Sequence, residues 1–344
     1  MADLATAPLV IAHRGASGYR PEHTLASYEL AARMGADYLE PDLVSTADGV
    51  LVARHEPGIG QTTDVAAHPE FAARRTVREI DGIERDDWFA DDFTAAELRT
   101  LRAVERLPQL RQGNTVYDGL FPVPTFDEIL ELRARLSAEL GREIGVYPET
   151  KSPTYFARRG LACEPALVAS LRAHGLDRAD SPVFVQSFET ANLRALRTEL
   201  PVRLVQLIDA HGAPADLVAT GDPRTYAELV RPDGLAWIAE YAAAIGPAKS
   251  LVLPPGGAPT PLVSTAHAVG LLVHAWTFRN ENSFLPESRR RTGREADHGD
   301  VLAEYRAFVD AGVDGLFTDQ PDTARVALDL VGRGPAARTE LVSS

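Results

Sequence analysis

Two histidines, an arginine and two carboxylates lie near the start of the chain at spacings that suit phosphate chemistry. The segment His13–Gly15 directly follows an apolar run at Leu9–Ala12, and Glu40 and Asp42 alternate along the next short apolar segment. Because side chains alternate along a strand, these two carboxylates share one strand face. His55 follows one short strand later. Imidazoles exchange protons near neutral pH and paired carboxylates hold hard cations, so this group could cleave a phosphate ester with a metal ion.

A third carboxylate extends the predicted metal site. Glu149 ends the third predicted strand, two residues before Lys151. Three carboxylates at neighbouring strand ends repel one another unless a cation joins them. We therefore expect one divalent cation bound through oxygen, Ca²⁺ by preference and Mg²⁺ as the second choice, rather than an ion-pair network. Zinc is not expected, because no cysteine or His-x-x-x-His spacing accompanies Glu40, Asp42 and Glu149.

The histidines divide into candidates for catalysis and ordinary residues. His13 and His55 are the catalytic candidates, one imidazole taking a proton while the other gives one. Arg14 carries a planar fork for phosphate oxygens, and Gly15 lets the backbone approach a ligand closely. His274 lies inside an apolar strand and is expected to be a hydrogen-bonded residue of the barrel. The other histidines are expected to have no catalytic role: His23, His68, His174, His211, His267 and His298.

Apolar strand-like runs alternate with amphipathic segments along the chain. The strands are predicted at Leu9–His13, Tyr38–Val44, Ile144–Tyr147, Val183–Val185, Leu204–Ile208, Leu235–Ile238, Leu271–Trp276 and Gly315–Thr318. Helices are predicted at Thr125–Leu140, Glu164–Ala173, Thr190–Leu200, Pro261–Val269, Val301–Asp310 and Asp322–Leu330, besides one beginning near Thr24. Eight β/α units predict an α/β fold of the (β/α)8 or TIM-barrel type, with its site at the carboxyl ends of the strands.

Three later residues fall at those strand ends. Gln186, Phe188 and Trp276 are therefore predicted, together with Arg14 and Lys151, to contact the substrate or its phosphate. The two aromatic side chains either belong to the core or wall a pocket for a glycerol or organic head group.

Two segments interrupt the repeat of strands and helices. Residues 57–124 contain no long apolar run and predict a small subdomain inserted after the second strand unit, over the mouth of the barrel. Residues 280–300 predict a polar rim loop, and residues 332–344 predict a polar tail. Residues 1–344 are otherwise expected to form a single barrel domain.

The composition excludes several classes of protein. The chain has 344 residues, a formal charge of −14 and one cysteine. The negative charge argues against general binding to nucleic acid or anionic membranes, and Cys163 alone cannot form an intrachain disulfide. Cys163 is expected to be a buried helical residue. No apolar run is long enough to span a membrane, and Met1–Ile11 lacks the basic start of a secretory signal.

At these residues the chain resembles the glycerophosphodiester phosphodiesterase family, and most closely its longer bacterial branch of secreted or periplasmic proteins. The resemblance covers Leu9 to Val331. The matching positions are His13-Arg14-Gly15, Pro21-Glu22-x-Thr24, Glu40-x-Asp42, Thr46-x-Asp48-Gly49, His55, Glu149-x-Lys151, Gln186–Glu189, Ala275–Arg279 and Gly315–Pro321. One position departs from the pattern, because the family usually has Pro-Glu-Asn-Thr where this chain has His23.

The resemblance implies metal-dependent hydrolysis of glycerophosphodiesters to glycerol 3-phosphate and an alcohol such as choline or ethanolamine, within glycerol and lipid metabolism. It implies that His13 and His55 are the acid–base pair and that Arg14 and Lys151 bind phosphate. Glu40, Asp42 and Glu149 would hold the metal. It also implies a secreted or periplasmic location, although a cytoplasmic one fits the absence of a signal segment.

Three other functions remain open from the sequence. A lysophospholipase D-type activity could use the same site, but it needs an apolar groove, and residues 57–124 are largely polar apart from a few aromatic and leucine side chains. A non-catalytic binding barrel should have lost one of the histidines or carboxylates. A carbon–carbon lyase would use the carboxylates but leaves the pair His13 and His55 unexplained. The nucleophile, water or the neighbouring glycerol hydroxyl, the head group and the oligomeric state are not determined by the sequence.

Overall fold

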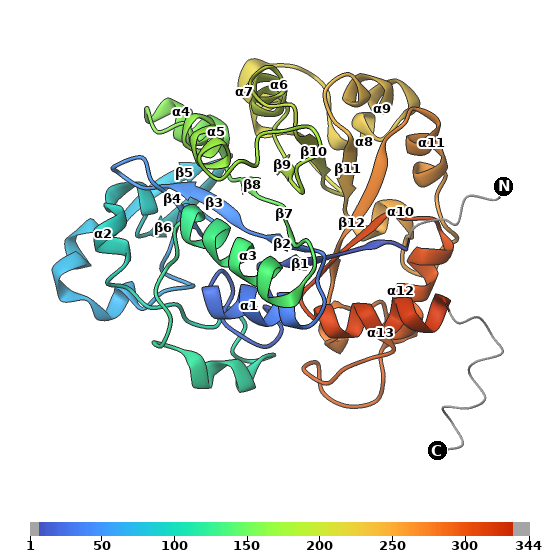
Figure 1. Ribbon diagram of the computed structural model, residues 1–344, viewed down its shortest axis with the longest axis horizontal. Helices are drawn as coiled ribbons and strands as arrows, with labels where there is room; N and C mark the ends of the chain where they lie inside the picture. The colour runs from blue at the N-terminus through green and yellow to red at the C-terminus, as the bar shows by residue number, and fades with distance from the viewer. Residues whose placement is uncertain (1–6, 333–344) are drawn as a thin grey trace.

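The computed structural model describes residues 7–332, which form a ring of strands surrounded by helices (Figure 1). Two of the strands are each broken once. β2 (Tyr38–Glu40) and β3 (Asp42–Ser45) flank Pro41, and β7 (Gly145–Val146) and β8 (Glu149–Thr150) flank Tyr147-Pro148. Proline cannot donate a backbone hydrogen bond, so the ladder is interrupted at both places.

When each broken strand is counted once, eight parallel strands close into a barrel. β1 (Leu9–His13) pairs with both β2 and the last strand, β13 (Gly315–Thr318). The remaining strands, in order around the barrel, are β9 (Phe184–Ser187), β10 (Arg203–Ile208), β11 (Ala244–Pro247) and β12 (Leu272–Phe278). The predicted TIM barrel is confirmed.

Helices cover the outside of the barrel (Figure 1). The longer ones are α1 (Leu25–Arg33), α3 (Phe126–Leu140), α5 (Cys163–Ala173), α6 (Thr190–Glu199), α12 (Val301–Asp310) and α13 (Pro321–Gly332). Shorter helices are α4 (Pro153–Arg158), α7 (Ala215–Thr220), α8 (Tyr226–Leu229), α9 (Pro232–Ala239), α10 (Lys249–Val252) and α11 (Leu262–Ala268). Thr125 begins α3 with a capping box to Glu128, a local signal that fixes where this helix starts.

One predicted strand was wrong. Leu235–Ile238 lies in helix α9, and the sixth strand of the barrel is β11 instead. An apolar run of four residues fits a strand or a buried helical turn equally well. Pro232 in the first turn of α9 suits a helix start, and Leu235 and Ile238 form its buried face. Strand β11 was not predicted because it contains Gly246 and Pro247, and both residues are uncommon inside strands.

The inside of the barrel is filled mainly by aromatic and β-branched side chains, including Tyr38, Tyr147, Phe184 and Phe317. His274 lies among them without solvent exposure, and its Nδ1 is 2.8 Å from the Tyr147 hydroxyl. The prediction of a hydrogen-bonded barrel residue is therefore confirmed. Cys163 is also fully buried, as expected.

The long connection from β4 (Leu51–Ala53), which pairs antiparallel with β3, to α3 has only short elements. They are the 3₁₀ helices η1 (Val65–Ala67), η2 (Pro69–Arg74), η3 (Ala90–Asp92) and η4 (Gln112–Tyr117), the hairpin β5 (Thr76–Ile80) to β6 (Ile83–Asp87), and helix α2 (Ala95–Leu98). Its status as a separate subdomain at 57–124 stays a prediction.

The predicted rim at 280–300 contains η5 (Asn282–Phe284) and η6 (Glu287–Arg289). The predicted tail, beyond its first residue, lies outside the described residues. Within residues 7–332, no helix has both the length and the apolar character that a membrane crossing requires.

Candidate active site

A cavity of about 590 Å³ opens where the barrel strands end, and the residues predicted from the sequence meet there. Its walls include His13, Arg14, Glu40, His55, Glu149, Lys151, Gln186, Phe188 and Trp276. Asp42 is 1% exposed and lies directly behind this wall. Each predicted site residue therefore either lines one cavity or lies directly behind its wall.

Three carboxylates form the floor of this site. One oxygen from each of Glu40, Asp42 and Glu149 lies within 4.8 Å of the others, and all three residues are buried. Burial and the neighbouring Asp42 raise the pKa of Glu149 to about 8, although Lys151 opposes the shift. Burial, followed by the charges of Asp42 and Glu149, also raises the pKa of Glu40 well above its usual range. Burial acts on Asp42 in the same direction, but Lys151, His55 and the hydrogen bond from His23 together outweigh it and hold the pKa of Asp42 well below its usual range.

Two cationic side chains border the carboxylates. Lys151 Nζ lies 2.7 Å from Glu149 Oε1 and 3.9 Å from Asp42 Oδ1. Arg14 Nε lies 3.3 Å from Asp42 Oδ2, and the Arg14 backbone N–H donates to Glu40 Oε2 at 2.8 Å. The backbone turns sharply here, with φ +59° at Arg14 and +86° at Gly15. A side chain at Gly15 would meet Ser27 at 2.4 Å, so only glycine fits that turn.

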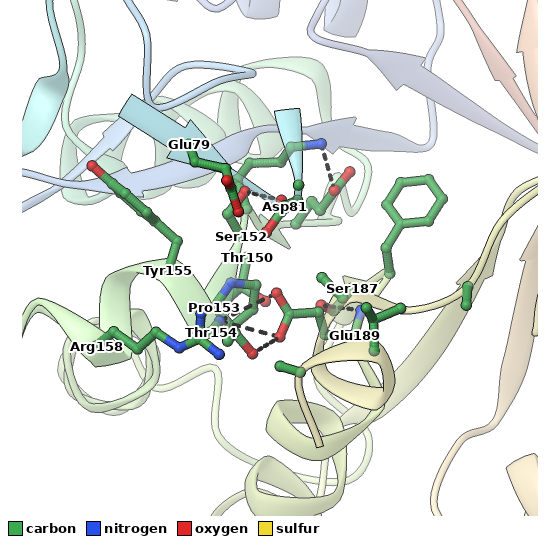
Figure 2. A pocket seen from close by; sticks show the side chains of 18 of the residues that line it. Glu79, Asp81, Thr150, Ser152, Pro153, Thr154, Tyr155, Arg158, Ser187 and Glu189 are labelled. Atoms are coloured by element: carbon green, nitrogen blue, oxygen red, sulfur yellow. Dashed lines mark hydrogen bonds and ion pairs between the residues drawn. The ribbon is translucent and has the colours of Figure 1, made fainter. Parts of the chain in front are cut away.

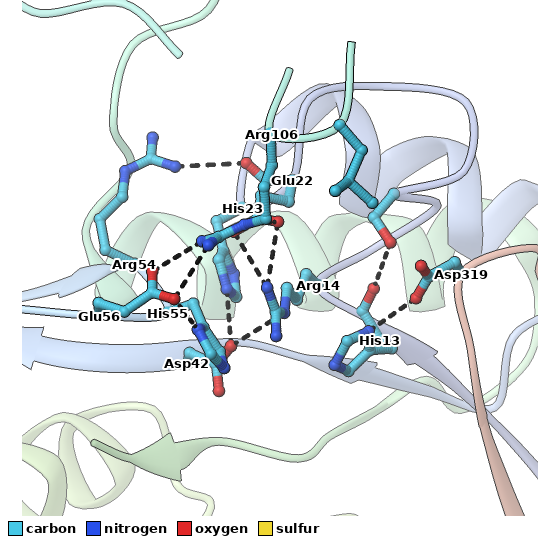
Figure 3. A network of polar contacts seen from close by, with 12 residues as sticks. His13, Arg14, Glu22, His23, Asp42, Arg54, His55, Glu56, Arg106 and Asp319 are labelled. Atoms are coloured by element: carbon cyan, nitrogen blue, oxygen red, sulfur yellow. Dashed lines mark hydrogen bonds and ion pairs between the residues drawn. The ribbon is translucent and has the colours of Figure 1, made fainter. Parts of the chain in front are cut away.

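Each candidate histidine has a carboxylate partner at Nδ1 (Figure 3). His13 Nδ1 lies 2.7 Å from Asp319 Oδ1, and His55 Nδ1 lies 2.5 Å from Glu56 Oε1. Since ionised carboxylates only accept, Nδ1 carries the proton in both rings and Nε2 is left for exchange. Burial, followed by the charge of Arg14, lowers the pKa of His13 to about 4 and that of His55 to about 3. Both imidazoles are therefore neutral at pH 7 before substrate binds.

The chain matches a known protein family over most of its length. Residues 13–323 match the model of the glycerophosphoryl diester phosphodiesterase family. The chain belongs to this family. It is 35% identical over 329 residues to the glycerophosphodiester phosphodiesterase GDPD6 of Arabidopsis thaliana, covering 91% of this chain and 83% of the relative. It is 32% identical to the glycerophosphodiester phosphodiesterase of Haemophilus influenzae, covering 92% and 88%. The enzyme is accordingly a glycerophosphodiester phosphodiesterase, a phosphoric diester hydrolase.

Solved structures of the family share its fold. A glycerophosphoryl diester phosphodiesterase structure from Silicibacter pomeroyi has a TM-score of 0.64 at 23% identity and covers 95% of each chain. A phosphodiesterase of Oleispira antarctica, solved in complex with the product sn-glycerol-3-phosphate, has a TM-score of 0.61 at 22% identity, covering 94% of this chain and 97% of that one.

His23, for which the sequence predicted no catalytic role, lies beside the carboxylates of the site. The His23 side chain is fully buried, and Nε2 lies 2.9 Å from Asp42 Oδ2. Nδ1 lies 2.7 Å from the Tyr28 hydroxyl. Because Asp42 is ionised, Nε2 donates to it and Nδ1 accepts from Tyr28. The departure from the family pattern at this position was the signal that could have drawn attention to it.

Sequence reasoning also missed the residues that hold the histidine partners in place. Asp319 accepts from Arg279 Nε at 2.9 Å and from Arg111 Nη2 at 2.5 Å. Glu56 is held in the same way by Arg106, at 2.8 and 2.9 Å (Figure 3). Arg106 and Arg111 come from the long connection between β4 and α3, where no motif marks them.

The three other predicted contact residues have specific partners. Gln186 Nε2 donates to Glu40 Oε1 at 3.0 Å, so this amide positions a carboxylate of the floor. Trp276 donates from its ring nitrogen to the backbone oxygen of Gly246 at 2.7 Å, and its ring meets that of Phe188 edge-on at 5.7 Å between centroids. Lys249 and Arg279, which were not predicted, also line the cavity on the side of Trp276.

Proposed function

We propose that this enzyme hydrolyses glycerophosphodiesters to glycerol 3-phosphate and an alcohol, with one divalent cation and with His13 and His55 as the acid–base pair. One observation carries the proposal. Two buried carboxylates, two cationic side chains and two carboxylate-supported histidines border a single cavity, and the third carboxylate of the cluster, Asp42, lies directly behind its wall. Each component of a metal-assisted phosphodiesterase is thus present within one site.

The carboxylates fit a divalent cation. Asp42 Oδ1 is buried without a hydrogen-bond partner among the described residues, and the pKa of Glu149 and of Glu40 is raised by burial and mutual repulsion. A cation between Glu40, Asp42 and Glu149 would relieve both conditions. Oxygen-only ligands suit Ca²⁺ or Mg²⁺, and Ca²⁺ is preferred because it tolerates irregular coordination. When bound, the cation would neutralise negative charge on the phosphate oxygens.

The protein's own side chains supply the remaining steps. Arg14 and Lys151 stand beside the carboxylates and can receive the non-bridging oxygens of the phosphate, where charge builds during the reaction. One of the two histidines removes a proton at Nε2 from the attacking hydroxyl. The other must first take up a second proton at Nε2 from water when the negatively charged phosphate enters, and it then gives this proton to the oxygen of the departing alcohol. Asp319 and Glu56 stabilise whichever ring becomes an imidazolium, because each accepts from Nδ1.

The attacking hydroxyl is either water or the neighbouring hydroxyl of the substrate's own glycerol. The second route forms a cyclic phosphate, which water then opens, and it uses both histidines twice in exchanged roles. Phosphorus NMR of the reaction mixture distinguishes the routes, because a cyclic phosphodiester accumulates only in the second.

The proposal is tested by incubating the purified enzyme with glycerophosphocholine, glycerophosphoethanolamine, glycerophosphoinositol and glycerophosphoglycerol, with and without chelator. We expect glycerol 3-phosphate from at least one diester, loss of turnover after chelation, and recovery with Ca²⁺ or Mg²⁺. Undiminished hydrolysis after dialysis against excess chelator would contradict the metal requirement. Release of phosphocholine in place of choline would contradict the stated bond cleavage.

A further inference from the structure

A second hollow of about 720 Å³ adjoins the reaction cavity. The two hollows share Glu149, Lys151, Phe188 and Asp209 as common wall, so the second one, which we call the side groove, continues directly from the phosphate site. Its other walls come from the tip of the β5–β6 hairpin and from helices α4, α7 and α8 (Figure 2). A substrate whose phosphate lies beside Lys151 can therefore extend one of its two ester arms into it.

We propose that the side groove binds the alcohol arm of the diester and selects alcohols that carry an ammonium group, such as choline or ethanolamine. The inference rests on the proposed function and adds the head-group class to it. Three independent features of the groove carry it: its charge, its aromatic wall and the way its carboxylates are held.

The wall of the groove has an excess of negative charge. Glu149 pairs with Lys151 on the common wall, and the other carboxylates, Glu79, Asp81, Glu189 and Asp209, form no ion pair within residues 7–332. The arginines on the same wall do not balance them. Arg78 lies 3.2 Å from Asp91 and 2.6 Å from Asp92, which lie outside the wall, and Arg159 contacts the same two aspartates. Arg158 is the one arginine of this wall without such a partner among the described residues.

The carboxylates of the groove are held by neutral donors, which leave their charge intact. Ser152 Oγ donates to Asp81 Oδ2 at 2.7 Å, and the backbone N–H of Thr154 donates to Glu189 at 3.1 Å. The Ala210 N–H donates to Asp209 Oδ1 at 2.6 Å. Burial raises the pKa of Glu189 to about 7, so this carboxylate is only partly ionised near pH 7.

The hairpin tip is built to place Asp81 at this position. Asp81 and Gly82 have φ values of +52° and +78°, the left-handed conformation of both central residues in a two-residue hairpin turn. The bond from Ser152 then ties the tip to the start of α4 (Figure 2). The carboxylate is therefore fixed over the groove rather than carried on a free loop.

Aromatic side chains connect the groove to the reaction cavity. The half-buried Phe188 ring meets Trp276 on the cavity side, at 5.7 Å, and Tyr226 on the groove side, at 6.2 Å between ring centroids. Lys151 Nζ already lies 5.6 Å from the Phe188 centroid, which shows that a cation can stand against this ring. Ammonium groups bind where aromatic faces and carboxylates combine, whereas an acyl chain gains nothing from unpaired carboxylates.

Two further cations line the reaction cavity outside the side groove, but both are paired. Lys249 Nζ lies 2.8 Å from Glu304 and Arg279 Nε lies 2.9 Å from Asp319, so neither gives that part of the cavity unpaired positive charge. The unpaired carboxylates of the side groove are therefore the feature that favours an ammonium arm there.

The test compares kcat/KM for glycerophosphocholine and glycerophosphoethanolamine with that for the uncharged-arm diester glycerophosphoglycerol. We expect the parent enzyme to prefer both ammonium diesters by about tenfold or more. The triple variant Glu79→Gln, Asp81→Asn and Asp209→Asn should lose this preference, mainly through a higher KM for the ammonium diesters. Its kcat/KM for glycerophosphoglycerol should stay within about threefold of the parent, which also shows that the variant is folded.

A charge-matched control separates the groove from the overall field of the protein. Glu84→Gln, Asp180→Asn and Asp233→Asn remove three exposed carboxylates that line neither hollow, and this variant should keep the preference. Equal kcat/KM for the three diesters in the parent would overturn the inference while leaving the proposed function intact. Equal slowing of all three by the groove variant would overturn it as well. Failure of the parent to cleave any diester would instead refute the proposed function.

Discussion

Arg106 binds Glu56 through two nitrogens, at 2.8 and 2.9 Å, and Glu56 in turn holds the Nδ1 atom of His55. The other histidine has the same arrangement, because Arg111 holds Asp319 and Asp319 holds His13. Both arginines come from the connection between β4 and α3, which therefore supports both ends of the proposed proton transfer. The β4–α3 connection contributes no carboxylate to the proposed cation site, but its two arginines orient the carboxylates that hold His13 and His55.

Replacing either arginine should reduce turnover without changing the cation site. Arg106→Met or Arg111→Met leaves a carboxylate free to move away from its histidine, and small misplacements of this kind cost up to about a hundredfold in kcat. The control is Arg99→Met, which lies in the same connection and pairs with Glu128 at the surface. Cation affinity is measured by calorimetry alongside kcat. A fall in cation affinity equal to the fall in kcat would mean that these arginines support the fold alone.

Lys151→Met should weaken stabilisation of the phosphate without unfolding the protein. Lys151 Nζ lies 2.7 Å from Glu149 and lines the cavity, where a point charge can reach a phosphate oxygen. The loss should appear in kcat/KM at about 2–4 kcal/mol, the range found when one oxyanion stabiliser is removed. Steady-state kinetics with the melting temperature as control provide the measurement. Kinetics equal to those of the parent would show that Lys151 does not stabilise the phosphate.

The sequence predicts most of the barrel because its signals are local. The apolar run before His13, the alternation of Glu40 and Asp42, and the spacing of Glu149 and Lys151 each lie within a few residues. Because the carboxyl ends of parallel barrel strands meet at one face, these residues lie close together without any longer-range signal. The strand at β11 escaped prediction for an equally local reason, since Gly246 and Pro247 weaken its strand pattern.

The supporting residues could not be predicted in this way. Arg111 and Asp319 are 208 positions apart, and Arg106 and Glu56 are 50 positions apart. Their meeting depends on how the β4–α3 connection folds back over the barrel, which no spacing rule encodes. His23 is a different case. In the sequence, the only feature that distinguishes it from a surface histidine is its position in the family motif.

The cation should stabilise the fold more strongly as the pH rises. The folded-state pKa of Glu149 is about 8 against an ordinary value of 4.5, and that of Glu40 is also raised. Between those values the folded protein binds more protons than the unfolded chain, so cation-free stability falls with increasing pH through this window. A cation removes the repulsion and needs ionised ligands. The rise in melting temperature on adding Ca²⁺ should therefore be larger at pH 8 than at pH 5.5.

Glu149→Gln provides the internal control for this pH dependence. The amide has no charge to lose, so the variant should show a smaller fall in cation-free stability over the same window. A Ca²⁺-induced shift in melting temperature that is equal at both pH values in the parent would count against a cation site at these carboxylates.

The hydrogen bond from His23 should support cation binding through Asp42. His23→Leu removes the donor and places a branched side chain at φ +55°, so cation affinity should fall by about 10- to 100-fold. His23→Asn supplies an amide donor and a residue that tolerates this backbone, and it should retain affinity within a few-fold of the parent. Calorimetric titration with Ca²⁺ measures both. Equal affinities for the leucine and asparagine variants would show that the donor does not matter.

His13 and His55 should act as a unit. Each has a carboxylate at Nδ1 and a free Nε2, and both line the cavity, so one step uses the two rings together. Either His→Ala change should cost at least about a hundredfold in kcat. The double variant should lose far less than the product of the single losses, because each single change already disables the shared step.

The pH–rate profile should separate the two histidines from the cation site. The parent is expected to show two limbs, and each single variant should lack one of them. Asp319 raises the pKa of His13 through its charge and hydrogen bond, so Asp319→Asn should move the His13 limb to lower pH. Cation affinity should stay near the parental value, because neither imidazole is proposed as a ligand. A folded, cation-loaded single alanine variant that keeps more than about a third of parental kcat would refute the two-histidine mechanism.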